Sequence, residues 1–375
     1  MNIALLVSSM HMGGAERVAA TLANAWAARG DRVTLVPTWV GRGECVYPLH
    51  EAVRLQFLAD RMPGDERRPP SRLRRLWALR DLIREVRADV VVSFLPHVNL
   101  AAILATRGLG VPVIVCERTD PVGNAAHGKG LNLARRWLYP MADAVTMQSR
   151  AAAERFRAAA SWLRRLEAIP NPLPDELLAR PLADTALQSG RGRLMALGRL
   201  HEEKGHEALM DAFARLAADF PDWDLWIWGE GDSRGSLARR ITGLGLDGRI
   251  HLPGSTSRPW DELARAQVFA LSSPREGFPN ALLEAMALGL PCISFDCPSG
   301  PREILRDGQD GLLVPVGDVA ALAGGLRRLL MDPKLRCELG ARAAASVRER
   351  YALARVLDEW DALFEAVRHE RRRAR

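Results

Sequence analysis

Cationic side chains follow a predicted strand in the second half of the chain. Arg199 and Lys204 come after the strand 193–198, and Glu230 lies in a glycine turn after the next strand, 224–229. Because the carboxyl ends of parallel strands meet at one edge of a sheet, these residues are expected at one ligand-binding edge. Arginine and lysine at that edge are suited to binding a diphosphate.

Two carboxylates form a second pattern further along the chain. Glu276 and Glu284 stand eight residues apart and bracket the loop between a predicted strand at 267–272 and a predicted helix at 280–289. A loop at the carboxyl end of a parallel strand is a usual place for ligand contacts. The alternative interpretation is that both glutamates lie on a solvated helix face.

The first half of the chain offers fewer candidates. Gly13 and Gly14 follow the first predicted strand, 2–8, and open a predicted helix at 14–29, a position where backbone N–H groups can hold a phosphate or another anion. A tight strand-to-helix turn without a ligand is the alternative. His97, after another predicted strand, is a weaker candidate, and a core or surface role is the simpler interpretation.

These positions depend on a regular alternation of strands and helices. Short Val, Ile and Leu runs without polar alternation predict parallel sheets covered on both faces, in an α/β fold with two Rossmann-like doubly wound domains facing across a cleft. Three prolines in 169–174 mark the boundary. We therefore expect domains at 1–170 and 171–353, with a helix at about 354–375 packing back on the first.

Two further patterns resemble known motifs but lie in the wrong context. Gly243, Gly245 and Gly248 fit a dinucleotide fingerprint, yet they follow a helix and precede a strand. Asp222 and Asp224 look like the carboxylate pair of metal-dependent sugar transferases, but they lie where the chain enters a strand. We therefore predict neither a dinucleotide site nor a metal site.

Taken together, these motifs resemble a known family. The early Gly-Gly, Gly-Arg-Leu followed by Glu-Lys-Gly at 198–205, the Gly-Glu-Gly turn at 229–231, and the segment from Glu276 through 311–315 occur in the order typical of retaining glycosyltransferase family four. Nearly the whole chain fits. The resemblance implies the GT-B architecture and transfer of a sugar from a nucleotide diphosphate sugar.

The resemblance also implies residue roles. Glu276 would lie beside the donor sugar, and Glu284 would accept hydrogen bonds from the two ribose hydroxyls, since a carboxylate offers two acceptor oxygens. Arg199 and Lys204 would bind the diphosphate. The remaining donor-binding residues that it implies are Gly13, Gly14, Glu230, Phe278, Asn280 and Ala281.

The sequence departs from the family pattern in the first domain. The family commonly has a histidine near the donor sugar there, whereas this chain has Cys116-Glu117-Arg118-Thr119-Asp120-Pro121. Arg118, with Glu117 beside it, is the candidate for this polar role. The segment 296–303 is most similar to bacterial members that extend lipid-linked or lipopolysaccharide glycans, often from UDP-hexoses or UDP-N-acetylhexosamines. The resemblance implies retention at the sugar carbon, no cofactor and no metal.

Charge is unevenly distributed along the 375 residues. The net charge is +7, with +9 in residues 1–170, +4 in 368–375 and −6 between them. Arginines around apolar residues at 72–87, preceded by Arg67 and Arg68, predict peripheral contact with anionic membrane; the alternatives are a core-facing helix and solvated arginines. Few aromatic residues, 6%, argue against nucleic-acid binding. Five scattered cysteines indicate a reducing cytoplasm.

Two other functions are compatible with parts of the sequence. Another GT-B enzyme, such as a sugar-nucleotide epimerase or a phosphorylase, would share both domains but lack the glutamate spacing. A non-enzymatic polyanion binder would account for the basic half, but not for the motifs of the second half.

Overall fold

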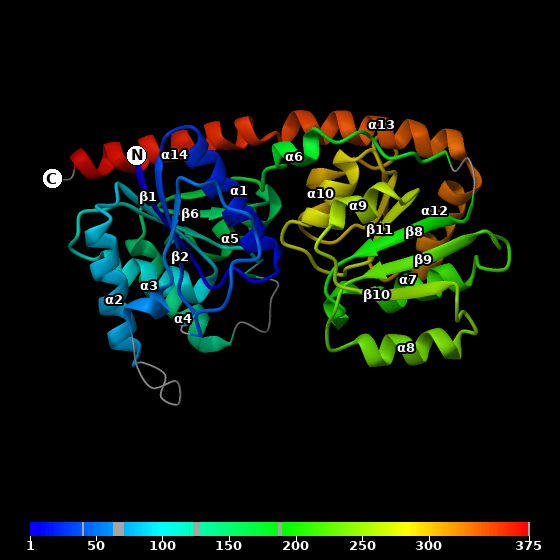
Figure 1. Ribbon diagram of the computed structural model, residues 1–375, viewed down its shortest axis with the longest axis horizontal. Coiled ribbons are helices and arrows are strands. Elements are labelled where there is room, and N and C mark those ends of the chain that lie inside the picture. The colour runs from blue at the N-terminus through cyan, green and yellow to red at the C-terminus, as the bar shows by residue number, and fades with distance from the viewer. Residues whose placement is uncertain (40, 63–70, 120, 123–127, 187–189, 374–375) are drawn as a thin grey trace. The chain divides into compact units, whose positions relative to one another are not determined.

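The computed structural model describes residues 1–39, 41–62, 71–119, 121–122, 128–186 and 190–373. The chain forms two compact units, each built on its own parallel sheet (Figure 1). Unit 1 comprises Met1–Pro172 and Leu353–Arg375, and unit 2 comprises Leu173–Ala352. The predicted α/β fold class with two Rossmann-like units is confirmed.

Unit 1 contains a seven-stranded sheet in the order β3-β2-β1-β4-β5-β6-β7. Its strands are almost wholly buried because helices cover both faces, which explains their continuous apolar runs. The strand order reverses between β1 and β4, and this reversal opens a crevice at the carboxyl edge of the sheet. The strands are β1 (Asn2–Val7), β2 (Arg32–Pro37), β3 (Val53–Leu55), β4 (Val90–Phe94), β5 (Val113–Cys116), β6 (Ala144–Met147) and β7 (Leu166–Ala168).

Helices from both ends of the chain cover the unit 1 sheet. One face packs α1 and α14, and the other packs α2, α3 and α5. Serine side chains cap two of these helices, since Ser71 accepts from the Arg74 amide at the start of α2 and Ser149 accepts from the Ala152 amide at the start of α5. The helices are α1 (Gly14–Ala28), α2 (Arg72–Glu85), α3 (Pro96–Thr106), α4 (Lys129–Leu138), α5 (Arg150–Ala159) and α14 (Leu353–Arg373).

The helix α14 is part of the unit 1 core. Trp360 and Phe364 lie against Trp26 of α1, with ring centroids 5.8 and 5.5 Å from that of Trp26. An ion pair of 2.6 Å joins Asp361 of α14 to Arg29 after α1. The first 172 residues therefore do not complete their own core, because one layer comes from a segment that follows unit 2 in the sequence.

Unit 2 contains a six-stranded sheet in the order β10-β9-β8-β11-β12-β13, again with a reversal beside its first strand. One face packs α7, α8 and α12, and the other packs α10 and α13. The strands are β8 (Gly192–Leu197), β9 (Trp223–Trp228), β10 (Ile250–Gly254), β11 (Val268–Leu271), β12 (Cys292–Phe295) and β13 (Leu312–Val314). The helices are α6 (Asp175–Leu178), α7 (His206–Ala214), α8 (Arg234–Gly243), α9 (Pro259–Ala264), α10 (Asn280–Ala287), α11 (Pro301–Ile304), α12 (Val319–Met331) and α13 (Pro333–Arg350).

The sequence-based elements differ from the structure at a few places. The short edge strands β7 and β13 and the short helix α9 were not expected. The helix expected from residue 204 begins at His206, because Glu202–Lys204 forms a 3-10 turn that ends at Gly205 in the left-handed region. No helix in the described part of the chain has both the length and the apolar character needed to cross a membrane.

Candidate active site

The candidate site of unit 2 lies where its strand order reverses. β8 and β11 are neighbours in the sheet, so the loop after β8 and the loop after β11 lie on either side of the crevice. Lys204, from the first loop, and Glu276, from the second, form an ion pair of 2.6 Å between Nζ and Oε1. Their side chains are 26% and 9% exposed. Two motifs predicted separately from the sequence are therefore in direct contact.

Close backbone packing fixes Lys204 beside the β11 loop. Gly205 has φ +61°, and a Cβ on it would lie 2.1 Å from the carbonyl oxygen of Ser272. The Ser272 hydroxyl donates to the carbonyl oxygen of Lys204 at 3.2 Å. Gly205 is thus required both for its left-handed conformation and for this close approach.

The loop after β12 supports Glu276 from the other side. The Ser299 hydroxyl donates to the carbonyl oxygen of Glu276 at 2.6 Å. Gly300 has φ +91°, and a Cβ there would lie 2.6 Å from Cδ of Pro279. A side-chain hydrogen bond and a close glycine contact from a third loop therefore hold the segment that carries Glu276.

A buried histidine holds the backbone at Arg199. The Arg199 side chain is exposed, while its carbonyl oxygen lies 3.2 Å from Nε2 of His206. Burial lowers the pKa of His206 to about 4; the bond to the Arg199 carbonyl opposes this shift, and the charge of Lys204 adds to it. His206 is therefore neutral at pH 7 and donates through Nε2. No sequence motif singles out His206, although it directly follows Lys204-Gly205.

Glu230 lies on a glycine turn packed against the end of β8. A Cβ on Gly229 would lie 1.9 Å from the carbonyl oxygen of Gly198, and a Cβ on Gly231 would lie 2.4 Å from that of Leu200. The Glu230 side chain is exposed and forms a 2.9 Å ion pair with Arg234. The turn thus reaches the same strand end as Arg199, with its carboxylate at the surface.

Glu284 is a buried carboxylate in α10, and only 4% of the residue is exposed. The indole Nε1 of Trp260, in α9, donates to its Oε2 at 3.1 Å. The guanidinium carbon of Arg180 lies 5.6 Å from the centroid of the Trp260 ring, and Arg180 also pairs with Asp261 at 2.5 Å. No local pattern in the sequence singles out Trp260 for this contact.

The three residues predicted beside Glu276 lie at the start of α10. Phe278 is buried and makes an edge-on contact with Tyr351, with ring centroids 5.7 Å apart. Pro279 is the N-cap and supplies no capping side chain, and Asn280 and Ala281 are the first two residues of the helix. The start of this helix therefore ends the loop that carries Glu276, the partner of Lys204.

The glycines of unit 1 form a closed turn before α1. The Gly13 amide donates to the Tyr47 hydroxyl at 2.8 Å, and that hydroxyl donates to the Gly13 carbonyl at 2.8 Å. Gly14 is the first residue of α1. The Gly13 N–H that was expected to face an anion is thus bonded within unit 1.

Glu117 is a structural residue rather than a site carboxylate. It is fully buried, and its two oxygens accept from Nε and Nη2 of Arg135 at 2.8 and 3.0 Å. The Tyr139 hydroxyl also donates to it. The charge of Glu117 is therefore compensated inside the unit, and this fully buried side chain is not the polar candidate expected beside Arg118. The weaker candidate His97 is exposed on the first turn of α3.

Arg118 occupies a different environment from its neighbour. Its guanidinium carbon lies 3.4 Å from the ring centroid of Phe94, and Nη1 donates to Oδ1 of Asn171 at 2.6 Å. Burial lowers its pKa to about 10, against the charges of Cys116 and Glu16. Asp120, two residues later, lies outside the described residues.

Of the two aspartates that look like a metal-binding pair, Asp222 is exposed before β9 and Asp224, in β9, has a structural role. Asp224 is buried and bonds Arg191 at 2.7 and 2.8 Å and Arg249 at 3.1 Å. Burial raises its pKa, but these two arginines outweigh that effect and lower it. Within the described part of the chain, no group of three His, Cys, Asp or Glu side chains is arranged to hold a metal ion.

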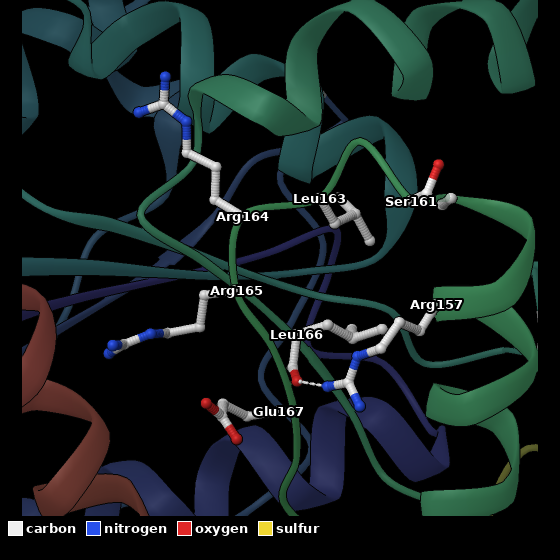
Figure 2. A pocket seen from close by; sticks show the side chains of 8 residues that line it. Arg157, Ser161, Leu163, Arg164, Arg165, Leu166 and Glu167 are labelled. Carbon is white, nitrogen blue, oxygen red and sulfur yellow. Dashed lines mark hydrogen bonds between the residues drawn. The ribbon is translucent and has the colours of Figure 1, made fainter.

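A pocket of about 490 Å³ lies at the amino end of β7, at the edge of the unit 1 sheet opposite its carboxyl edge. Figure 2 shows Arg157 turned toward the carbonyl of Leu166, which it bonds, whereas Arg164 and Arg165 point away from it. The pocket contains no predicted site residue, and none of its lining residues belongs to the carboxyl edge where ligands of such sheets bind.

The sequence matches two family profiles that together cover most of the chain. Residues 13–172 match the family described as "Glycosyl transferase 4-like domain", and residues 183–346 match "Glycosyl transferases group 1". The chain belongs to the glycosyltransferases. The resemblance inferred from the motifs is confirmed, and this glycosyltransferase has the GT-B architecture.

Several proteins are similar over nearly the whole glycosyltransferase chain. An exopolysaccharide phosphotransferase of Streptomyces coelicolor is 30% identical over 96% of this chain, which spans only 40% of that protein's length. A Campylobacter jejuni protein, named for N-acetylgalactosamine transfer to a glycan on diphospho-undecaprenol, is 28% identical over 98% of this chain and 99% of its own. The structure of Anabaena HepE, in complex with UDP and glucose, superposes with a TM-score of 0.80 at 19% identity, covering 97% of this chain and 99% of HepE.

Proposed function

We propose that this chain transfers a hexose or N-acetylhexosamine from a UDP-linked donor to a hydroxyl of a lipid-linked or polysaccharide acceptor, with retention of configuration. The observation that carries the proposal is the contact of Lys204 with Glu276 at the reversal point of unit 2. It joins a cation suited to a leaving diphosphate to a carboxylate suited to sugar hydroxyls. A strand-to-helix turn with no ligand would not require this pair.

The reaction develops negative charge on the departing phosphate and positive charge on the sugar. Lys204 has three N–H donors and uses one on Glu276, so the same ammonium group can also donate to a phosphate oxygen. Arg199 supplies a second cation at the end of the same strand. Fixed cations of this kind stabilise the leaving group more in the transition state than in the ground state.

Glu284 would bind the ribose of the donor. A carboxylate has about four acceptor positions, and Trp260 occupies one of them at Oε2. We propose that the ribose hydroxyls donate to this carboxylate, which the indole N–H holds in one orientation. HepE, which has the same fold, was crystallised with UDP, and this supports a uridine nucleotide.

The acceptor proposal is supported by the relatives. The Campylobacter jejuni protein named for a polyprenol diphosphate glycan aligns over 99% of its length. We propose an acceptor of the same chemical class: a growing glycan linked to a lipid diphosphate, or a related polysaccharide, of the bacterial cell envelope.

Sugar transfer is the test of the proposal. The protein is incubated with a panel of UDP-, GDP- and ADP-sugars and the release of each nucleotide is measured; we expect release from one UDP-sugar. Proton NMR of the product then reads the anomeric configuration. Lys204→Met should slow the release by about 10- to 100-fold, whereas Lys334→Met, at a lysine whose side chain is 87% exposed, should leave it unchanged. Equal release by the wild type and Lys204→Met would contradict the proposal.

The proposed mechanism needs no metal ion, because Arg199 and Lys204 supply the positive charge. Activity should therefore persist in EDTA. If chelation abolished transfer and Mg²⁺ or Mn²⁺ restored it, the proposed mechanism would be wrong, and Asp222 and Asp224 would become candidate metal ligands.

We also propose peripheral attachment of unit 1 to an anionic membrane surface at the cytoplasmic face. The basic segment divides into two parts: Leu79, Leu82 and Ile83 of α2 are buried in the core, whereas Leu73 and Trp77 are 69% and 58% exposed. These two side chains lie one turn apart among arginines, and this arrangement suits insertion at a lipid interface. Arg67 and Arg68 lie outside the described residues.

A second helix has the same character. On α4, Leu133 and Trp137 are 58% and 70% exposed and also lie one turn apart. Wild type should sediment with vesicles that contain anionic lipid but not with neutral ones, and a Leu73→Ser/Trp77→Ser variant should bind less. Binding that does not depend on lipid charge at low salt would contradict this proposal.

A further inference from the structure

Arg118 is held on two sides at the carboxyl edge of the unit 1 sheet. It comes two residues after β5, and its guanidinium lies over Phe94, the last residue of the neighbouring strand β4. Asn171 accepts from its Nη1 at 2.6 Å. Stacking and a hydrogen bond therefore fix the plane of the guanidinium. The opposite edge of the group carries Nε and Nη2.

That opposite edge has no hydrogen-bond partner in the part of the chain that the structure describes. Nε and Nη2 are both buried, and neither is hydrogen-bonded to any residue that the structure describes. With a pKa of about 10, the side chain carries its charge at neutral pH. Buried charged donors are very rarely left unpaired in a native protein, so these two N–H groups are candidates for binding a ligand.

Among the described residues, two arginines are almost wholly buried, and both use every guanidinium nitrogen in a hydrogen bond. Arg135 directs its Nε and Nη2 at the two oxygens of Glu117. Arg336 uses all three of its nitrogens on backbone carbonyls, among them those of Thr185 and Leu329. The charge of Glu16 acts on Arg118, yet no ion pair joins Arg118 to a carboxylate of the described residues. Arg118 therefore departs from the way in which this chain buries arginine.

We propose that Arg118 binds a substrate diphosphate through its Nε and Nη2 edge. This edge presents two parallel N–H donors, the geometry that binds two oxygens of one phosphate. The inference rests on the proposed function, which supplies two sources of a diphosphate: the nucleotide donor and the lipid-linked acceptor. Lysine at this position would supply a point charge but not the paired donors.

The experiment compares full-length wild type with Arg118→Gln and Arg118→Lys. Arg164→Gln, which removes an exposed arginine of the same unit, serves as the matched control. Calorimetry gives the Kd of UDP, UMP and inorganic pyrophosphate, and steady-state kinetics give the KM of the acceptor. The loss of two charge-assisted bonds should weaken diphosphate binding by about 10- to 100-fold.

The two arms distinguish the two sources. If the donor is bound, Arg118→Gln weakens UDP and pyrophosphate more than UMP; if the acceptor is bound, the acceptor KM rises while the Kd of UDP is unchanged. Either result supports the proposal. Because removal of an unpaired buried charge relieves the folded state, we also expect the Tm of Arg118→Gln without ligand to stay the same or rise.

The proposal would be overturned if the Kd of UDP and pyrophosphate and the KM of the acceptor for Arg118→Gln were all within twofold of the values for Arg164→Gln. If the Tm also fell, the role of Arg118 would be structural. If Arg118→Gln did not fold, Arg118→Lys would decide, and wild-type constants in that variant would likewise overturn it. Because pyrophosphate binding needs no sugar transfer, it can be measured even if the proposed function fails.

Discussion

Mild acid should destabilise this protein through His206. The residue is 5% exposed and donates from Nε2 to the Arg199 carbonyl at 3.2 Å. Its Nδ1 is buried and has no hydrogen-bond partner among the described residues. Protonation would place an N–H on Nδ1, which has no acceptor among the described residues, beside the charge of Lys204. This is the physical reason why burial holds the pKa at about 4.

The magnitude follows from the difference between the folded and unfolded states. The unfolded chain takes up the proton with a pKa of about 6.5, and the folded chain takes it up at about 4. The contribution of His206 to stability is therefore complete above pH 6.5 and declines as the pH falls toward 4. At about 1.4 kcal/mol per pKa unit, the full loss is about 3 kcal/mol, and about 2 kcal/mol is lost by pH 5.

Urea unfolding at pH 7 and pH 5 tests this expectation. His206→Gln keeps an N–H donor for the Arg199 carbonyl but does not titrate, and His201→Gln is the control at an exposed histidine. The free energy of unfolding of wild type should fall between the two pH values by about 2 kcal/mol more than that of His206→Gln. Carboxylates titrate in both proteins, so their contribution to the pH dependence of the free energy of unfolding cancels in the comparison. Equal pH dependence in both proteins would refute the reasoning.

Further predictions concern the candidate site. Glu284→Ala should raise the Kd of UDP, whereas Glu276→Ala should mainly lower kcat, because the ribose is bound equally before and during the reaction; unchanged UDP affinity in Glu284→Ala, measured by calorimetry, would contradict the ribose assignment. Trp260→Phe should weaken UDP binding and reduce the preference for UDP over 2′-deoxy-UDP, since the indole N–H orients the carboxylate; an unchanged preference would argue against that role. Lys204→Ala and Arg199→Ala should each lower kcat/KM by about 10- to 100-fold. The double variant should lose less than the product of the two effects because both cations serve one diphosphate. A loss of kcat/KM below about threefold in either single variant would show that the substituted residue does not bind the diphosphate.

The sequence was sufficient for the architecture of both units. Continuous apolar runs separated by amphipathic helices allow few alternatives to parallel sheets, and the strands predicted from them are present. The edge strands β7 and β13 were missed because three residues are too few to establish a periodicity. The helix α9 has six residues and was missed for the same reason.

The site could be predicted only in part. The loop positions of Lys204 and Glu276 follow from local sequence, but their contact depends on β8 and β11 being neighbours, and strand order is not encoded locally. Glu117 and Arg118 show the same limit on a smaller scale. They are adjacent in sequence, yet one is neutralised by Arg135 and the other is not, because their partners come from distant segments.

The separation of α14 from the rest of unit 1 has a consequence for synthesis on the ribosome. Translation completes α13 and all of unit 2 before Leu353 is added, so the α1 face of unit 1 remains uncovered throughout that interval. Trp26, fully buried in the finished protein, stays accessible until Trp360 and Phe364 arrive. Domains made first usually fold first. Here the domain that starts first is completed last, so the nascent chain exposes the apolar face of α1 until α14 is made. During this interval a chaperone that binds apolar surfaces can bind that face.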